Sequence, residues 1–337
     1  MIYRLGLATL VVTTLFSTLN ATQDMNKWLR PLEVPQPKDN LLTPERIELG
    51  KLLYFDTRLS SSGKISCATC HHPKRGWTDL IPVAKAVGHQ GRVGPRNSPV
   101  ILNSAYQNRQ FWDGRVRTLE QQAVGPIETG VEMNMPLDKL LPTLNNIKGY
   151  QKLFKVAYPK SKGIITKDYL AKAIASFERT VVSTTSPFDR FIKGDSYAIN
   201  QKAKEGFELF QGKAHCTDCH DGFNFTDGSF HNVGLGDDDI GRQQMKMKRK
   251  AWSHAFKTPT LRDIEKSGPY FHDGSVFTLQ ESVAICGNGG RYPNKYGTSS
   301  SIKNRNLNTN DIDKITQFLK TLTGPNLPII VPTVFPN

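Results

Sequence analysis

The chain has 337 residues, with 44 lysines and arginines against 30 aspartates and glutamates, which gives a formal charge of +14. This length suits two domains of ordinary size or one large domain. A hydrophobic content of 38% with 17 phenylalanines is enough to form buried cores, so a disordered chain is excluded. Five cysteines are too few for a disulfide scaffold of this size.

The first 21 residues have the features of a secretion signal. Residues 1–4 form a short basic start, residues 5–19 are mostly apolar, and Ala21 offers a small residue for cleavage. A membrane anchor is the alternative, but the apolar run is short and rich in threonine for a span of about 20 residues. The sequence therefore predicts a cleaved signal peptide over 1–21 and an exported protein.

Four of the five cysteines belong to two copies of the pattern C-x-x-C-H. The copies are Cys67, Cys70 and His71, and Cys216, Cys219 and His220. In a c-type haem site, two such thiols form thioethers with the haem vinyl groups, and the adjacent histidine becomes the proximal iron ligand. A shared zinc site and a thioredoxin-like redox pair are the alternatives. Two copies that both end in histidine, behind an export signal, favour two covalent haems.

Each motif lies between an amphipathic helix before it and a second one well after it. The first motif follows a helix that begins at Thr43-Pro44, an N-cap with proline at the first helical position, and precedes a helix that begins near Thr166. The second motif follows helical spacing over 203–210 and precedes a helix that begins near Thr309. The same unit therefore occurs twice.

This repeat predicts an all-α fold of two cytochrome c-like domains, each with one covalently bound c-type haem and with few short strands. We expect an N-terminal domain over 22–185 and a C-terminal domain over 186–337, joined around 183–187. No other segment is apolar enough to span a membrane.

Five stretches of the chain match a known family in sequence and in order. They are 94–99 (GPRNSP), 111–115 (FWDGR), 130–133 (GVEM), 186–190 (SPFDR) and 269–275 (PYFHDGS). Over roughly residues 40–325, the chain resembles the bacterial di-haem cytochrome c peroxidases, a family that includes the MauG-type enzymes. The resemblance implies that the N-terminal domain holds a peroxidatic haem and the C-terminal domain an electron-transfer haem.

The resemblance also implies roles around the first haem. His89 matches the distal histidine that closes the peroxidatic haem at rest, and it would have to swing away before peroxide binds. Glu132 matches the distal carboxylate, which moves a proton during peroxide cleavage, and Gln122 matches a neighbour in the same pocket. Trp112 matches the tryptophan between the two haems, where it would relay electrons. Without the resemblance, these would be interpreted as ordinary surface or core residues.

A calcium site between the domains is implied in the same way. Asn97 and the backbone oxygens of Ser267 and Pro269 match the family's calcium ligands, and calcium prefers oxygen ligands of this kind. His272 matches a residue near the second haem that does not bind its iron.

Cys286 departs from the family pattern. It lies where the peroxidases place a methionine ligand of the second haem and where MauG-type enzymes place a tyrosine. We expect Cys286 to bind this iron, with Met245, Met247, Tyr292 or no sixth ligand as alternatives. A thiolate donates electron density and would lower the haem potential that methionine raises.

The densest basic run is 246–250, Lys-Met-Lys-Arg-Lys. One interpretation is a solvated loop, and the other is a docking patch that attracts an acidic protein. No nucleic-acid motif appears, so nucleic acid is not an expected partner.

The first functional hypothesis is a periplasmic di-haem peroxidase that reduces hydrogen peroxide to water, with electrons from a small cytochrome or cupredoxin. The second is a MauG-like enzyme that uses peroxide to oxidise a Trp or Tyr of an acidic partner protein, such as a secreted copper-binding protein. The third is a pure electron carrier, which has no use for Glu132. Association with the cell surface and formation of a homodimer are two further alternatives.

Overall fold

The computed structural model describes residues 25–79, 85–245 and 250–337. The signal peptide expected over 1–21 and residues 246–249 of the basic run, which include Met247, lie outside the described residues. Within the described ranges, no helix has both the length and the apolar character needed to cross a membrane.

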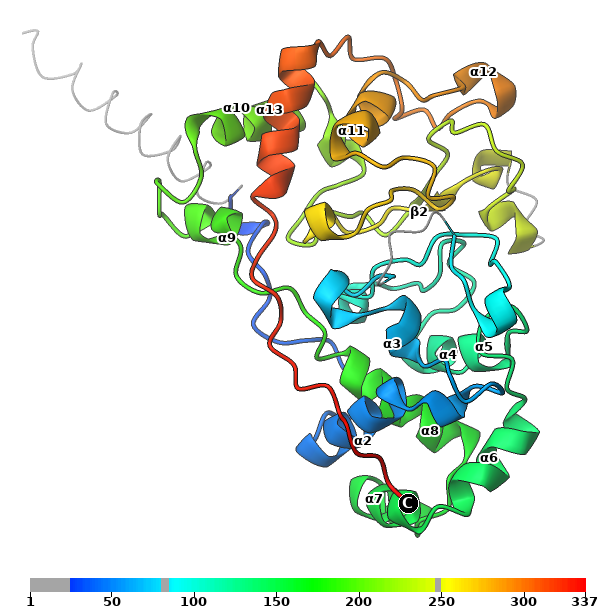
Figure 1. Cartoon of the computed structure of the whole chain (residues 1–337). Helices are drawn as coiled ribbons and strands as arrows, with labels where there is room; N and C mark the ends of the chain where they lie inside the picture. Colours follow the sequence, from blue (N-terminus) through cyan, green and yellow to red (C-terminus); the bar gives the residue numbers. More distant parts are fainter. Residues whose placement is uncertain (1–24, 80–84, 246–249) are drawn as a thin grey trace, which may run out of the picture.

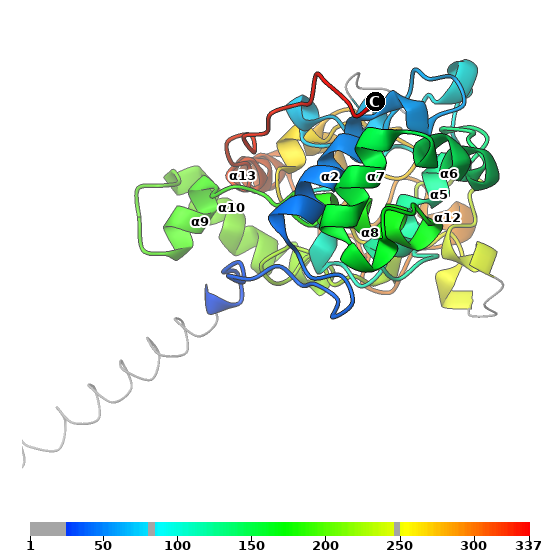
Figure 2. The ribbon, with the colours of Figure 1, turned by 90° about the horizontal axis from the view of Figure 1, so that it is seen from below.

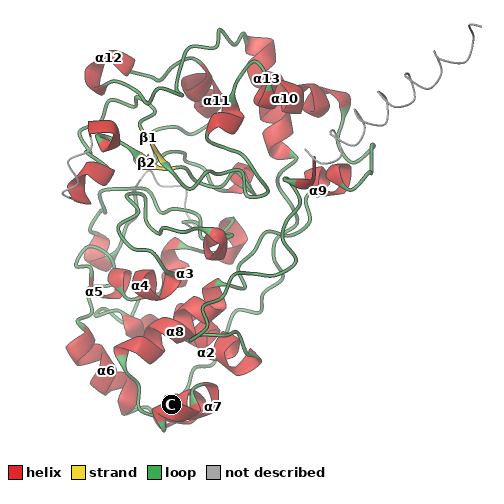
Figure 3. Cartoon of the chain, turned by 180° about the vertical axis from the view of Figure 1, so that it is seen from behind, coloured by secondary structure: helices red, strands yellow, loops and turns green. Residues whose placement is uncertain are grey.

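The described chain consists mostly of helices and loops (Figure 3). Its first half contains α2 (Pro44–Phe55), α3 (Cys67–Cys70), α4 (Leu119–Ala123), α5 (Gly125–Glu128), α6 (Leu137–Asn145), α7 (Lys148–Ala157) and α8 (Lys167–Glu178). Its second half contains α9 (Pro187–Ile192), α10 (Gln201–Gln211), α11 (Leu279–Gly287), α12 (Pro293–Tyr296) and α13 (Thr309–Lys320). In the described ranges, β1 (Phe230–His231) and β2 (Phe256–Lys257) form one antiparallel pair. The predicted helical fold with few short strands is confirmed.

The first half is organised around the packing of α2 against α8, with α7 beside α2 (Figure 2). Thr43 and Thr166 cap the two long helices, because each side chain accepts a backbone N–H of the first turn. A Cβ added to Gly50 would lie 1.9 Å from the carbonyl oxygen of Ala173, so only glycine lets the two backbones come this close. The core beneath this crossing includes Leu49, Leu53, Leu140, Phe154, Leu170 and Ile174.

The second half repeats this arrangement with α10 and α13. A Cβ added to Gly206 of α10 would lie 2.0 Å from the carbonyl oxygen of Lys314 in α13. The core here is rich in aromatic side chains, among them Phe188, Phe207, Phe210, Phe225 and Phe318. The repeat seen in the sequence therefore corresponds to two equivalent helix crossings, one before and one after the linker.

Each end of the described chain packs against the opposite half. Trp28 is fully buried among the phenylalanines of the second-half core. After α13, the C-terminal tail runs back along the first half (Figure 1), where the N–H of Gly149 donates to the Asn337 oxygen at 2.9 Å. The apolar residues of this tail that pack on the first half are Leu327, Ile329 and Phe335. The boundaries 22–185 and 186–337 stay a prediction, and both chain ends cross them.

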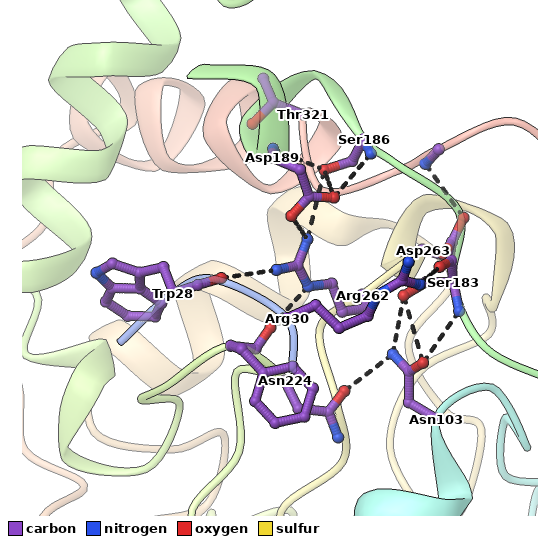
Figure 4. Close-up of polar contacts among 12 residues, drawn as sticks. Trp28, Arg30, Asn103, Ser183, Ser186, Asp189, Asn224, Arg262, Asp263 and Thr321 are labelled. Atoms are coloured by element: carbon purple, nitrogen blue, oxygen red, sulfur yellow. Dashed lines mark hydrogen bonds and ion pairs between the residues drawn. The ribbon is translucent and has the colours of Figure 1, made fainter. Parts of the chain in front are cut away.

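A buried polar cluster joins the linker to both halves (Figure 4). The guanidinium of Arg262 donates to Asp189 Oδ1 at 2.6 Å and to the backbone oxygen of Trp28 at 3.2 Å. From the first half, Asn103 Nδ2 donates to Ser183 Oγ at 3.0 Å. These bonds fix the linker between the two halves.

Candidate functional site

A cavity of about 250 Å³ lies between the two halves. The residues predicted for the site that line it are His71, Asn97, Trp112, Gln122, Cys216, Cys219, His220, Ser267, Pro269 and Cys286. His71 and His220, the two predicted proximal ligands, therefore face one continuous space. The predicted residues that do not line this cavity are Cys67, Cys70, His89 and Glu132.

The first motif is formed by one helical turn. Cys67 and Cys70 are the two ends of α3, which Thr69 stabilises by accepting the backbone N–H of Ser66 at 3.0 Å. Burial lowers the pKa of the following His71 to about 4, so its imidazole is neutral, the form that binds a metal. Burial also raises the pKa of Cys70 to about 12.

The second motif presents its histidine in a fixed orientation. His220 Nδ1 lies 2.8 Å from the backbone oxygen of Phe225 and must donate to it, since a carbonyl oxygen only accepts. This bond leaves Nε2 unprotonated and available to a metal, as in metal sites where the second ring nitrogen is held by a carbonyl. Cys216 begins a short 3-10 turn, Cys216–Asp218, ahead of this histidine.

The zinc alternative receives no support from the geometry. Within the described ranges, one group of three potential metal-binding side chains comes together, and it consists of Cys219, Asp227 and His231. It does not unite the two C-x-x-C pairs, so the four motif cysteines do not converge on one ion.

His89 and Glu132 lie side by side in the first half. The backbone N–H of His89 donates to the backbone oxygen of Glu132 at 2.7 Å, and the ring Nδ1 of His89 lies 3.2 Å from Ser61 Oγ. Desolvation raises the pKa of the Glu132 carboxyl, and the charge of Arg115 opposes this rise. The charge of Glu132 also acts on the thiols of the first motif. The predicted gate and the predicted proton carrier thus belong to one neighbourhood.

Trp112 lies where the two halves meet. Its Nε1 donates to the backbone oxygen of Asn97 at 2.9 Å, and its own backbone oxygen accepts the N–H of Lys257 at 2.8 Å. Its ring centroid is 6.4 Å from that of His272 in a T-shaped arrangement. The indole is therefore held by residues from both halves, on the wall of the shared cavity.

The comparisons with known proteins identify the family of this chain. The family model for di-haem cytochrome c peroxidase matches residues 44–197. The methylamine utilization protein MauG of Methylorubrum extorquens is 40% identical over 332 residues, which cover 95% of this chain and 93% of the relative. The chain belongs to the di-haem cytochrome c peroxidase family.

Both named branches of this family are close to the chain. The cytochrome c551 peroxidase of Nitrosomonas europaea is 36% identical over 318 residues, which cover 91% of this chain and 89% of the peroxidase. The crystal structure of a MauG-like protein associated with microbial copper homeostasis superposes with a TM-score of 0.79, at 29% identity, over 88% of this chain and 95% of that one. The resemblance predicted from the motifs is confirmed, and this di-haem family member is an oxidoreductase of the peroxidase type.

The cavity fits haem in its chemistry. Haem combines an apolar ring with two carboxylates, and the wall supplies both kinds of partner. Lys257 lines the cavity, burial lowers its pKa to about 7, and no carboxylate in the described ranges forms an ion pair with it. A buried ammonium without an anion is unfavourable, so a cofactor carboxylate suits this place. The apolar residues of the wall include Ile101, Phe210, Phe256, Leu261 and Leu319.

Cys286 lies on the wall of the same cavity as His220. It belongs to α11, and burial raises the pKa of its thiol to about 12, with the charge of Cys219 adding to the rise. Of the alternative ligands, Met245 and Tyr292 are exposed, with 37% and 57% of their surface accessible, and neither lines the cavity. Cys286 and His220 therefore line one cavity, and the role of the thiol as a ligand stays a prediction.

The predicted calcium ligands converge only in part. Asn97 Nδ2 donates to the backbone oxygen of Pro269 at 2.6 Å and to that of Phe271 at 3.3 Å. Ser267 lines the same cavity, and its hydroxyl donates to Ile264. Calcium would need the Asn97 amide turned so that Oδ1 faces these carbonyl oxygens. The donor atoms suit calcium after that rotation, and the site stays a prediction.

Sequence reasoning missed two charged residues of the cavity wall, Lys257 and Glu178. Lysine is exposed in most proteins, and Glu178 at a helix end before Arg179 has the pattern of an ordinary surface ion pair. Only the tertiary packing shows that both side chains are turned inward, so no local signal could have identified them.

Proposed function

We propose that this protein is a periplasmic peroxidase that reduces hydrogen peroxide to water at the first haem, with electrons relayed through the second. The observation that carries the proposal is the position of Glu132. Its carboxyl has a raised pKa and its charge acts on both thiols of the first C-x-x-C-H motif, while its backbone oxygen accepts the backbone N–H of the buried His89. An electron carrier would have no use for such a pair.

The residues have distinct roles in this reaction. Cys67 and Cys70 would attach the first haem and His71 would bind its iron, while Cys216, Cys219 and His220 would do the same for the second. The bound haem supplies an iron that binds peroxide and takes up its oxidising equivalents.

Glu132 moves the proton that peroxide cleavage requires. A carboxyl can accept a proton from one peroxide oxygen and return it to the other, which then leaves as water. Its raised pKa suits this exchange, because desolvation makes the carboxylate a stronger base than in water. Gln122, which lines the cavity, would orient the bound peroxide by hydrogen bonding.

His89 gates this site, and Trp112 lies on the electron route between the halves. With His89 as an iron ligand, peroxide has no open position, so reduction of the second haem would release the histidine first. Rapid mixing with hydrogen peroxide tests this directly. If only the half-reduced protein reacts, the gated peroxidase is supported; immediate reaction of the fully oxidised protein would contradict the gate.

A MauG-like reaction is the second candidate, and Cys286 favours it. A thiolate at the second haem would lower its potential, which weakens the acceptance of electrons from a small donor protein. The identity of 40% to a MauG protein points the same way. In this case a Trp or Tyr of a partner protein would be oxidised. We then expect the fully oxidised form of this protein to react with hydrogen peroxide without any electron donor.

The partners follow from charge and from the expected export signal. A net charge of +14 suits an acidic docking partner, either a small cytochrome or cupredoxin donor or an acidic protein substrate. The predicted signal peptide would direct the protein to the periplasm. Calcium held by Asn97, Ser267 and Pro269 would complete the contact between the halves.

A further inference from the structure

Glu178 is a buried carboxyl group that forms no salt bridge within the described part of the chain. It is the last residue of α8, only 6% of its surface is accessible, and it lines the cavity together with His71 and Gln122. Its Oε2 is buried and forms no hydrogen bond with the described residues. An ionised carboxyl in such a place is unfavourable unless another group supplies positive charge.

Arg179, the residue after Glu178, forms its ion pair with a different carboxylate. Arg179 forms an ion pair with Glu120, with its Nη1 2.7 Å from Oε1, and its Nη2 donates to Oε2 at 3.0 Å. Glu120 also accepts a hydrogen bond from Asn40 at 2.9 Å. The Arg179–Glu120 pair is therefore close to neutral as a whole, so the positive charge of Arg179 offsets the burial of Glu178 only in part.

The surroundings of Glu178 hold few other charges. The titratable or charged groups that interact with it are Tyr54 of α2, Cys67 of α3, Glu120 of α4 and its neighbour Arg179. His71 lines the same cavity. Burial raises the pKa of Glu178 to about 8, with Arg179 opposing the rise and Glu120 adding to it. Once Cys67 is bound to haem as a thioether, it has no proton to exchange. Glu178 then stays as the titratable acid on the wall of the cavity that His71 also lines, where the haem would be held.

We propose that Glu178 exchanges a proton in step with the charge of the first haem. The carboxyl takes up one proton from solvent for each electron that a donor delivers to this haem, and it releases the proton when the electron leaves. The positive charge of the oxidised iron stabilises the carboxylate, whereas the reduced iron favours the neutral acid. The inference rests on the proposed attachment of haem at Cys67 and Cys70.

This exchange would keep the charge of the buried site nearly constant during turnover. Adding an electron to a low-dielectric cavity is electrostatically unfavourable unless a positive charge, such as a proton, enters with it. Glu178 supplies this compensation from the cavity wall, and Glu132 is then free for the proton transfer on peroxide itself. The two carboxyls thus have separate tasks at the same haem.

A redox titration of the holoprotein at several pH values tests the proposal without any peroxide. The wild-type potential of the first haem should fall as pH rises around pH 8, approaching 59 mV per unit, because each unit is a tenfold change in proton activity for a one-electron couple. Glu178→Gln, which mimics the neutral acid, should abolish this slope with both haems attached. The titration should show one reduction step for each haem, and the step that shifts in His89→Ala belongs to the first haem.

Glu128→Gln, at an exposed carboxyl of α5, is the matched control and should keep the wild-type slope. The same slope in Glu178→Gln would overturn the proposal. Infrared difference spectra of the wild-type protein give a second readout: the band of a protonated carboxyl should disappear on oxidation, and its absence would equally overturn the proposal. A protein that shows the predicted pH dependence but does not turn over peroxide would contradict the proposed function only, because the redox titration uses no peroxide.

Discussion

At the scale of single residues, Glu132 offers the sharpest test of the chemistry. Glu132→Gln keeps the shape of the side chain and removes its ability to accept a proton. We expect peroxide turnover to fall by about 10²–10⁴-fold, the usual contribution of a positioned acid–base group. Haem content and both absorption spectra should stay unchanged. Steady-state peroxide assays compare it with Glu128→Gln, and wild-type turnover in Glu132→Gln would exclude the acid–base role.

Cys286 is the residue that separates the two candidate reactions. If its sulfur binds the second haem, Cys286→Met replaces a strong donor by a weaker one and should raise that haem's potential by on the order of 0.1 V. A redox titration followed by absorption measures the change. Cys286→Ala serves as the comparison that removes the sulfur altogether. If the potential and spectrum stay the same in both variants, Cys286 is not a ligand.

The residues that could be predicted from the sequence are those whose chemistry depends on local spacing. Cys67, Cys70 and His71 form a motif because one helical turn places two thiols and an imidazole together. Glu178 and Lys257 could not be predicted, since their importance arises from a cavity between distant segments. The pairing of Arg179 with Glu120 across 59 positions, rather than with its neighbour, is a result of packing alone.

At the scale of elements, the helices that begin with a capping threonine were predictable. Thr43 occupies the N-cap of α2 as expected, and α8 begins after Thr166, near the predicted start. Each threonine caps its helix because a side-chain oxygen satisfies an N–H that the first turn leaves free. The packing of these helices was less visible. Gly50 and Gly206 look like weak points in a helix, and only the crossings explain why glycine is needed there.

The second crossing can be tested with Gly206→Ala. The added methyl group would meet the carbonyl oxygen of Lys314, so α10 and α13 must separate. We expect the free energy of unfolding to fall by about 1–3 kcal/mol, as for other overpacked sites. Denaturant unfolding measures this change. Gly125→Ala is the control, because the nearest atom to its Cβ belongs to Phe111 at 3.4 Å and the variant should be nearly neutral.

At the scale of the whole molecule, the packing of each chain end against the opposite half could not be predicted. Residues 25–30 and the tail after 325 lack helical periodicity, and their apolar side chains suit any exposed surface in need of cover. Trp28 completes the second-half core, and the tail covers the first half. The two halves are therefore tied by both ends as well as by the linker. This arrangement would hold the spacing of two haems on which electron transfer depends.

Removal of 327–337 tests whether the tail stabilises the first half. The deletion uncovers apolar surface beside Tyr54 and Phe177 and removes the bond from Arg58 to the Pro336 oxygen at 2.9 Å. We expect a loss of about 2–5 kcal/mol in the free energy of unfolding. Faster hydrogen exchange should appear in α7, where Gly149 loses its contact with the tail.

Two full-length variants separate this effect from chain length. Phe335→Ser alters a tail side chain that packs on the first half and should reproduce part of the loss, whereas Val334→Ser alters a neighbour that is 80% exposed and should be neutral. Because the linker and the Arg262 cluster remain, the second half should keep its stability in all three proteins. Equal losses in both halves would mean that the two unfold as one unit, and the tail would then stabilise the entire molecule. Unchanged stability in the truncated chain would show that the tail contacts contribute nothing.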